Sequence, residues 1–253
     1  MGFQMWEPYR QSLMAEHRFY IEQAQERLLS QFGNIEAEAD KAAQAHLEHT
    51  AQYFDPDKHD PADCYEAAND AGIEFYQLLS DMHDATRLSV VAGMFHQRDK
   101  KLRDWLLMEI KHWHQGSKAT QAIWKMNFPD CIDLLAALGF YVKSHAFYEH
   151  LDAMRLVVNV FKHGNGASLN ELREKFPEFI PDPLQGIFKD WTPTDLTDHT
   201  DLKVTDRHIS QFSDAILEFW TRVPGQMFLA DEVCFPACFE KAILKDLDCI
   251  DAN

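Results

Sequence analysis

Apolar residues recur at helical spacing along most of this chain, while the alternating pattern of a β-strand is almost absent. The first such segment covers residues 9–30, with core positions at Leu13, His17, Tyr20, Ile21, Ala24 and Leu28. Side chains three or four residues apart share one face of a helix, which can then be buried against other helices. We therefore predict an all-α fold, a bundle of about six to eight helices with an irregular loop before a C-terminal helix.

Capping and turn-forming residues divide the periodic sequence into separate helices. Asn34, Thr205 and the pair Ser168 and Glu171 are expected to cap helix N-termini, because their side chains accept hydrogen bonds from unpaired backbone N–H groups. Gly164–Gly166 is expected to end a helix. The predicted helices cover about residues 9–30, 34–54, 60–79, 87–113, 129–138, 142–163, 168–176 and 205–223, with a short helix from residue 236.

The C-terminal third of the chain differs in composition, because residues 177–204 are rich in Pro, Asp and Thr. We predict a main helical bundle over residues 1–176. Residues 177–253 are then a loop excursion and a C-terminal helical segment packed on the bundle. No clear linker separates the two parts, so one single domain is the alternative. With 253 residues the chain can bury a core in either case.

The formal net charge of −17 is the strongest constraint on possible partners. Such a surface repels polyanions, so RNA could bind only through a local basic patch, whereas a basic protein partner is favoured. No apolar run is long enough to span a membrane, and the first residues lack the pattern of a secretory signal. We therefore expect no membrane association and a cytoplasmic location.

Cysteine and histidine spacing gives little support for a metal site. The cysteines are odd in number and scattered, at Cys64, Cys131, Cys234, Cys238 and Cys249. Reduced, structural thiols are expected, since CxxC pairs are absent. Glu109 and His112 form half of a di-iron motif, but no second Glu-x-x-His follows. Glycine-rich phosphate loops and nucleophile elbows are also missing, so we predict no metal and no cofactor.

The segment from Arg155 to Gly164 contains the leading candidate site. Arg155, Asn159 and His163 are four residues apart and line one polar edge of an otherwise apolar helix. His163 lies in the last turn, where the helix dipole favours its protonated form. His163 could then exchange a proton during RNA cleavage, with Arg155 and Lys162 stabilising phosphate charge and Asn159 positioning the substrate. The alternative is structural: Asn159 bonds a neighbouring helix, and the other residues form a helix terminus.

A second group of polar residues lies on the segment from Phe95 to Trp105. His96, Asp99 and Arg103 fall on one helical stripe, and a carboxylate beside a histidine orients its ring and raises its proton affinity. Basic residues also concentrate here, at Arg98, Lys100, Lys101 and Arg103. If the helix packs against the one ending at His163, the two stripes form one pocket. The alternative is a solvated, salt-bridged helix face.

The residues Asn159-Val160-Phe161-Lys162-His163-Gly164 resemble the end of the signature helix in HEPN-like proteins, which are all-helical bacterial and archaeal toxins and defence ribonucleases. The family motif is an arginine, often followed by a polar residue, then four to six residues, and then a histidine. Here seven residues separate Arg155 from His163, and Leu156 follows the arginine. The resemblance implies a helical bundle, a homodimer whose two motifs face each other, and metal-independent RNA cleavage.

Two functional hypotheses follow from the sequence. The first is a HEPN-like bacterial toxin or anti-phage defence protein that cleaves RNA without a metal. The second is a non-catalytic acidic interaction protein, a scaffold or an antitoxin, that binds a basic partner. The polar edge ending at His163 favours the first hypothesis, and the charge of −17 favours the second.

Overall fold

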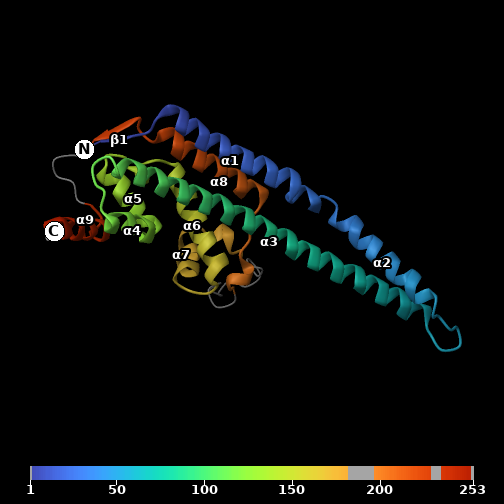
Figure 1. Cartoon of the computed structure of the whole chain (residues 1–253). Helices are drawn as coiled ribbons and strands as arrows, with labels where there is room; N and C mark the ends of the chain where they lie inside the picture. The colour runs from blue at the N-terminus through green and yellow to red at the C-terminus, as the bar shows by residue number, and fades with distance from the viewer. Residues whose placement is uncertain (1, 182–196, 229–234, 252–253) are drawn as a thin grey trace. The chain divides into compact units, whose positions relative to one another are not determined.

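The computed structural model describes residues 2–181, 197–228 and 235–251, and these are predominantly helical (Figure 1). The predicted all-α fold is confirmed. The strands in the described residues form one short antiparallel pair, β1 (Gly2–Gln4) with β2 (Gln226–Phe228), in which Phe3 lies opposite Met227. Among the described helices, none combines the length and the hydropathy that crossing a bilayer requires.

The chain divides into two compact units. The first consists of Met1–Ile21 and Val91–Asn253, and the second consists of Glu22–Val90. Residues on both sides of position 176 belong to the first unit; the predicted division at that position stays a prediction. The helices are α1 (Glu7–Arg27), α2 (Ile35–Ala51), α3 (Pro61–Ile110), α4 (Ser117–Lys125), α5 (Phe128–Ala137), α6 (Phe147–His163), α7 (Ala167–Lys175), α8 (Asp206–Arg222) and α9 (Ala237–Asp251).

The core of the first unit is built from large apolar side chains on several helices. Leu102 and Trp105 of α3 are buried, as are Phe212, Phe219 and Trp220 of α8. Helix α6 packs against α8 and buries a run of Leu, Val and Met residues from its middle turns. Each such side chain stabilises the fold by about 1.5–3 kcal/mol, which accounts for the cohesion of this unit.

The N-terminal strand is held in the first unit by side chains of α3 and by Trp113, which follows that helix. Phe3 is buried and meets the rings of Trp105 and Trp113 edge-on, with centroids 6.3 Å apart in both pairs. The indole N–H of Trp105 donates to the Gln4 carbonyl at 3.1 Å, and the Gln4 N–H donates to Glu109 at 2.7 Å. Glu109, half of the motif considered for metal binding, therefore pairs with the backbone of β1.

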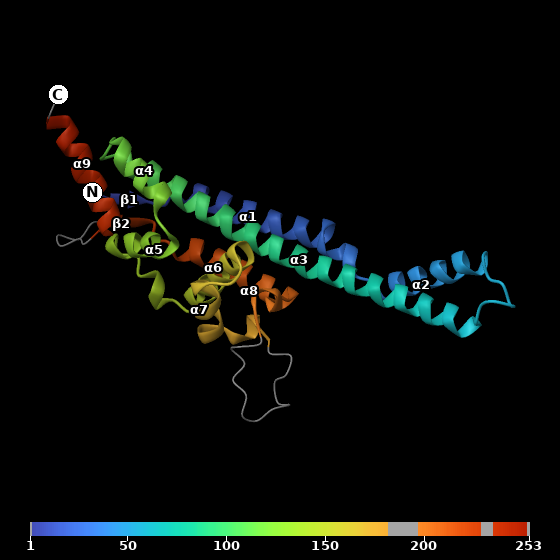
Figure 2. The same ribbon diagram turned by 90° about the horizontal axis from the view of Figure 1, so that it is seen from below.

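The second unit is a helical hairpin, in which α2 runs alongside the part of α3 that ends at Val90 (Figure 2). We call residues 22–90 the hairpin. Its helices approach closely, because a Cβ on Gly72 would lie 3.0 Å from the Ala43 Cβ. Near the open end, the Phe32 and His83 rings stack at 4.6 Å. Small residues at the crossing allow close packing but bury little apolar area.

Several predicted helix boundaries are wrong. The segments predicted at residues 60–79 and 87–113 form the single helix α3. Residues 142–163 contain a short 3₁₀ turn before α6 begins at Phe147. Helix α4 was not predicted. The expected capping box of Ser168 and Glu171 does not form, because α7 begins after Gly166 and Glu171 binds cations instead. Asn34 precedes α2 but makes no side-chain capping bond. Thr205 does cap α8, as predicted.

Candidate functional site

The polar edge predicted on α6 runs from a partly buried arginine to an exposed histidine. Arg155 and Asn159 are half-buried, whereas Lys162 and His163 are exposed. The helix ends at Gly164, whose φ of 69° is readily adopted only by glycine and whose N–H donates to the Val160 carbonyl at 2.8 Å. The four residues are thus on the predicted helix, with His163 in its last turn.

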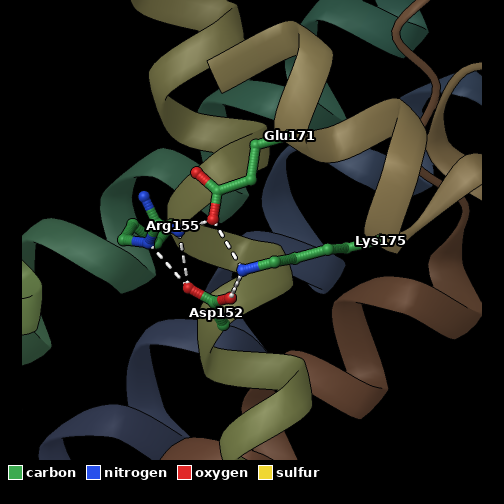
Figure 3. A network of polar contacts seen from close by, with 4 residues as sticks. All are labelled: Asp152, Arg155, Glu171 and Lys175. Carbon is green, nitrogen blue, oxygen red and sulfur yellow. Dashed lines mark hydrogen bonds and ion pairs between the residues drawn. The ribbon is translucent and has the colours of Figure 1, made fainter. Parts of the chain in front are cut away.

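Arg155 is part of an ion-pair network with Asp152, Glu171 and Lys175 (Figure 3). Its Nε donates to Asp152 Oδ1 at 2.7 Å, and its terminal nitrogen donates to Glu171 Oε1 at 2.9 Å. Lys175 Nζ lies 2.7 Å from the same Glu171 oxygen and 3.4 Å from Asp152 Oδ2. Two cations and two carboxylates therefore balance each other and join α6 to α7.

The network shifts the pKa values of Glu171 and Lys175. Burial opposes ionisation of Glu171, but the hydrogen bonds and charges of Lys175 and Arg155 outweigh it and lower the Glu171 pKa. The hydrogen bond to Glu171 also raises the pKa of Lys175. Both shifts favour the charged forms of Glu171 and Lys175. A phosphate could reach the Arg155 guanidinium only by displacing carboxylates that already neutralise it.

His163 lies far along the helix from this network, since eight residues correspond to about 12 Å of rise. His199, which was not predicted as a site residue, lies at the end of the same helix. The ring of His199 packs against Gly164, so that a Cβ there would lie 3.6 Å from the imidazole carbons. Asn165 Oδ1 accepts the backbone N–H of His199 at 3.0 Å and lies 3.1 Å from its Nδ1. The end of α6 thus presents His163 beside a segment that carries a second imidazole.

The residues of the second predicted stripe, on α3, have different environments. Arg103 is buried and binds Asp99 through two nitrogens, at 2.7 and 3.2 Å. It also donates to the backbone carbonyls of Ile123 and Met126 at the end of α4. His96 is exposed and packs edge-on to Phe95, with ring centroids 5.6 Å apart. Arg103 and Asp99 therefore anchor α4 on α3.

Arg98, on the same segment, has an unusual environment for a charged side chain. Its side chain is buried, with an exposed fraction of 2%, and none of its guanidinium nitrogens has a hydrogen-bond partner among the described residues. The guanidinium carbon lies 4.8 Å from the ring centre of Phe128 and 5.1 Å from that of Phe219. The aromatic faces offset part of the cost of burying this charge. Burial lowers the Arg98 pKa to about 10.

The cysteines whose side chains the structure describes give no sign of reactive chemistry. Cys131 is buried, and burial raises the pKa of its thiol to about 11, which opposes formation of a nucleophilic thiolate. Cys234 and the side chain of Cys249 lie outside the described residues. In the described part of the chain, no three His, Cys, Asp or Glu side chains converge as metal ligands.

The hairpin exposes large apolar side chains that its own packing leaves uncovered. Phe75, Leu78 and Met82 lie at i, i+3 and i+7 on α3 and have exposed fractions of 38%, 63% and 60%. We call these three residues the apolar stripe. By helical geometry, the exposed residues Asp70, Glu74 and Asp81 form an acidic flank on one side of it. This surface could be predicted from the sequence, because α3 carries more apolar residues than its pairing with α2 can bury.

Comparisons with protein-family models, with curated proteins and with solved structures found no match.

Proposed function

We propose that this chain is an interaction protein, a scaffold or an antitoxin, whose hairpin binds a basic and amphipathic helical segment of a protein partner. The observation that carries the proposal is the apolar stripe on an acidic hairpin. Contiguous exposed apolar side chains with a polar rim are typical of protein-binding surfaces. Burial of Leu78 and Met82 against a partner would stabilise a complex by about 1.5–3 kcal/mol for each side chain.

The negative charge of the hairpin favours a partner that carries basic residues. Residues 22–90 contain fifteen Asp and Glu and four Lys and Arg, so the hairpin carries −11 of the chain's −17. A second hairpin of the same sequence would meet this surface with like charge, which disfavours a homodimer through this face. A partner with Lys or Arg beside its apolar residues would instead be attracted and oriented.

A pocket near the closed end of the hairpin offers a place for an anchoring side chain. It has a volume of about 410 Å³ and opens between the end of α2 and the start of α3. Leu47, Phe54 and Tyr65 contribute apolar walls, and Glu48 contributes a carboxylate. An apolar side chain next to a lysine or arginine fits both features, since deeply seated apolar anchors dominate the energy of most interfaces.

The test uses a labelled synthetic helix with lysines on one face and leucines on the other, titrated with the whole chain by fluorescence anisotropy. Wild type should bind this peptide more tightly than a peptide in which serine replaces every leucine. The variant Leu78→Ser/Met82→Ser should weaken binding by about tenfold or more. Met108→Ser/Leu244→Ser, which changes a methionine and a leucine that are also exposed but lie outside the hairpin, should bind as wild type does. Equal loss in both variants would contradict the proposal.

Metal-independent RNA cleavage by a HEPN-like protein is the second candidate function. Exposure of His163 and Lys162 at the end of α6, beside the segment with His199, supports it. Carboxylates already balance the charge of Arg155, so of the two residues predicted to stabilise phosphate, Lys162 is the one that this role would require.

Total RNA incubated in EDTA with wild type, His163→Ala or the control His46→Ala tests this activity. Cleavage that only His163→Ala abolishes would establish the ribonuclease. RNA that stays intact with wild type would exclude ribonuclease activity and leave binding as the proposed function.

A further inference from the structure

We propose that a groove between α4 and α9 binds a small anion that carries several phosphate groups, such as a condensed phosphate. The groove lies in the first unit, so the inference goes beyond the function proposed for the hairpin. Helices α4 and α9 lie side by side (Figures 1 and 2) and enclose a volume of about 340 Å³. This volume is near the lower end of the range for small-molecule pockets.

Matching stripes of residues on the two helices form the walls of the groove. Lys118 and Lys125 lie at the first and last positions of an i, i+3, i+4, i+7 stripe on α4, and Ala122 lies between them. On α9, Cys238, Lys241, Ala242 and Lys245 follow the same spacing. The two alanines leave space at the centre, while the lysines at the edges have the length to reach a ligand there. We call this site the lysine groove.

The lysine groove is strongly positive in an acidic protein. The described residues that line it include four lysines and one carboxylate, Asp130, whose Oδ2 lies 3.9 Å from the Cys238 Sγ. Within the described residues, none of the four lysines forms an ion pair with a carboxylate. Four ammonium groups around one groove are only partly balanced by a single carboxylate and repel each other, and a polyanion would relieve that repulsion. The distant acidic residues matter little here, because salt screens charges beyond about 8 Å at physiological ionic strength.

Asp246 holds the two walls together. Its buried carboxylate accepts the backbone N–H groups of Lys118 at 3.0 Å and Ala119 at 2.8 Å, and lies 3.0 Å from His114 Nε2. Burial works against its charged form, but these hydrogen bonds dominate and lower the Asp246 pKa. An ionised Asp246 therefore fixes the start of α4 to α9, so that the two helices carrying the lysines are held on either side of one space before any ligand arrives.

The lining residues also indicate the class of anion. Lysine ammonium groups bind phosphate as point charges, without the planar geometry by which arginine recognises a carboxylate. None of the described residues that line the groove is aromatic, so nothing there would stack on a nucleobase. A chain of phosphates, free or as part of a nucleotide, is thus the ligand that this site would recognise.

Isothermal titration calorimetry of the whole chain with sodium tripolyphosphate, without divalent cations, tests the inference. Wild type should show one saturable site. Lys125→Ala/Lys241→Ala should lower the affinity by about tenfold or more, since the variant loses one charged contact from each wall of the groove. Lys41→Ala/Lys100→Ala, which removes the same charge from exposed positions elsewhere, should bind as wild type does. Ala122→Leu should block binding with no change in charge.

Three further arms complete the test. A nucleoside triphosphate that binds as tightly as tripolyphosphate would support recognition of the phosphate chain, whereas citrate binding equally well would overturn the assignment to phosphate. Absence of wild-type binding, or equal affinity of Lys125→Ala/Lys241→Ala, would overturn the site itself. If that variant unfolds, Lys118→Ala/Lys245→Ala takes its place. None of these results depends on the hairpin, so they leave the proposed function to its own test.

Discussion

At the scale of single residues, His17 is expected to make stability depend on pH. It is buried with its Nε2 2.9 Å from the Ser213 hydroxyl, and burial lowers its pKa from 6.5 to about 4. In the unfolded chain the ring takes up a proton near pH 6.5, so the folded state loses stability as the pH falls from there toward 4. Between pH 7 and pH 5 this loss is about 2 kcal/mol.

The variant His17→Gln retains a partner for Ser213 and removes the titration. Urea unfolding at the two pH values should therefore show a smaller loss of unfolding free energy for His17→Gln than for wild type. The same loss in both proteins would show that His17 is not held neutral in the fold.

Arg98 gives a second prediction at this scale, with the opposite sign from most core substitutions. Burying a charge without hydrogen bonds costs several kcal/mol, and stacking on aromatic rings returns only about 2 kcal/mol. Arg98→Met fills a similar volume without a charge and should raise the free energy of unfolding by about 1–3 kcal/mol. Thermal unfolding followed by circular dichroism measures the change. A lower melting temperature for Arg98→Met would mean that the guanidinium has a partner that stabilises it.

The contacts of individual side chains were the property that the sequence predicted least well. The spacing of Arg155, Asn159 and His163 correctly placed all three on one helix. It could not show that Glu171 binds the arginine, because Glu171 belongs to a different helix. The burial of Arg98 depends in the same way on Phe128 and Phe219, which lie on α5 and α8.

At the scale of helices, Asp246 is expected to control how α4 is held on α9. Asp246→Ala leaves two backbone N–H groups at the start of α4 without their acceptor, at a cost of about 1–3 kcal/mol. Hydrogen exchange of the Lys118 and Ala119 amides should accelerate in this variant, while amides in the middle of α8 should change much less. Unchanged protection at the start of α4 would show that other contacts hold the two helices together.

Helix boundaries could be predicted where the chain itself supplies the signal. Thr205 marks the start of α8 and Gly164 the end of α6, since a cap or a positive φ is a local property. The pairing of β1 with β2 joins residues more than two hundred positions apart, and three-residue strands show no clear alternation. The continuity of α3 was also hidden, because residues 80–86 contain few apolar side chains with which to mark a helix face.

At the scale of the whole molecule, the helical class followed from periodicity, whereas the division into units did not. The second unit begins inside α1 and ends inside α3, so no loop marks either boundary in the sequence. Its charge does mark it, since 69 residues carry −11 and the other 184 carry −6. The apolar stripe stays exposed on this small, acidic hairpin, so it adds little to the stability of the fold. An exposed apolar surface of this kind favours a role in binding.

The effect of salt and charge on binding of the lysine–leucine helix is the most direct test of that role. Glu74→Lys/Asp81→Lys reverses two charges of the acidic flank, and Glu174→Lys/Asp214→Lys reverses two exposed charges outside the hairpin. We predict that the first variant loses affinity by about tenfold or more at low salt and that the difference shrinks as salt is added. The second variant should match wild type. Equal affinities of both variants at low salt would contradict the account of the hairpin as the surface that binds a basic partner.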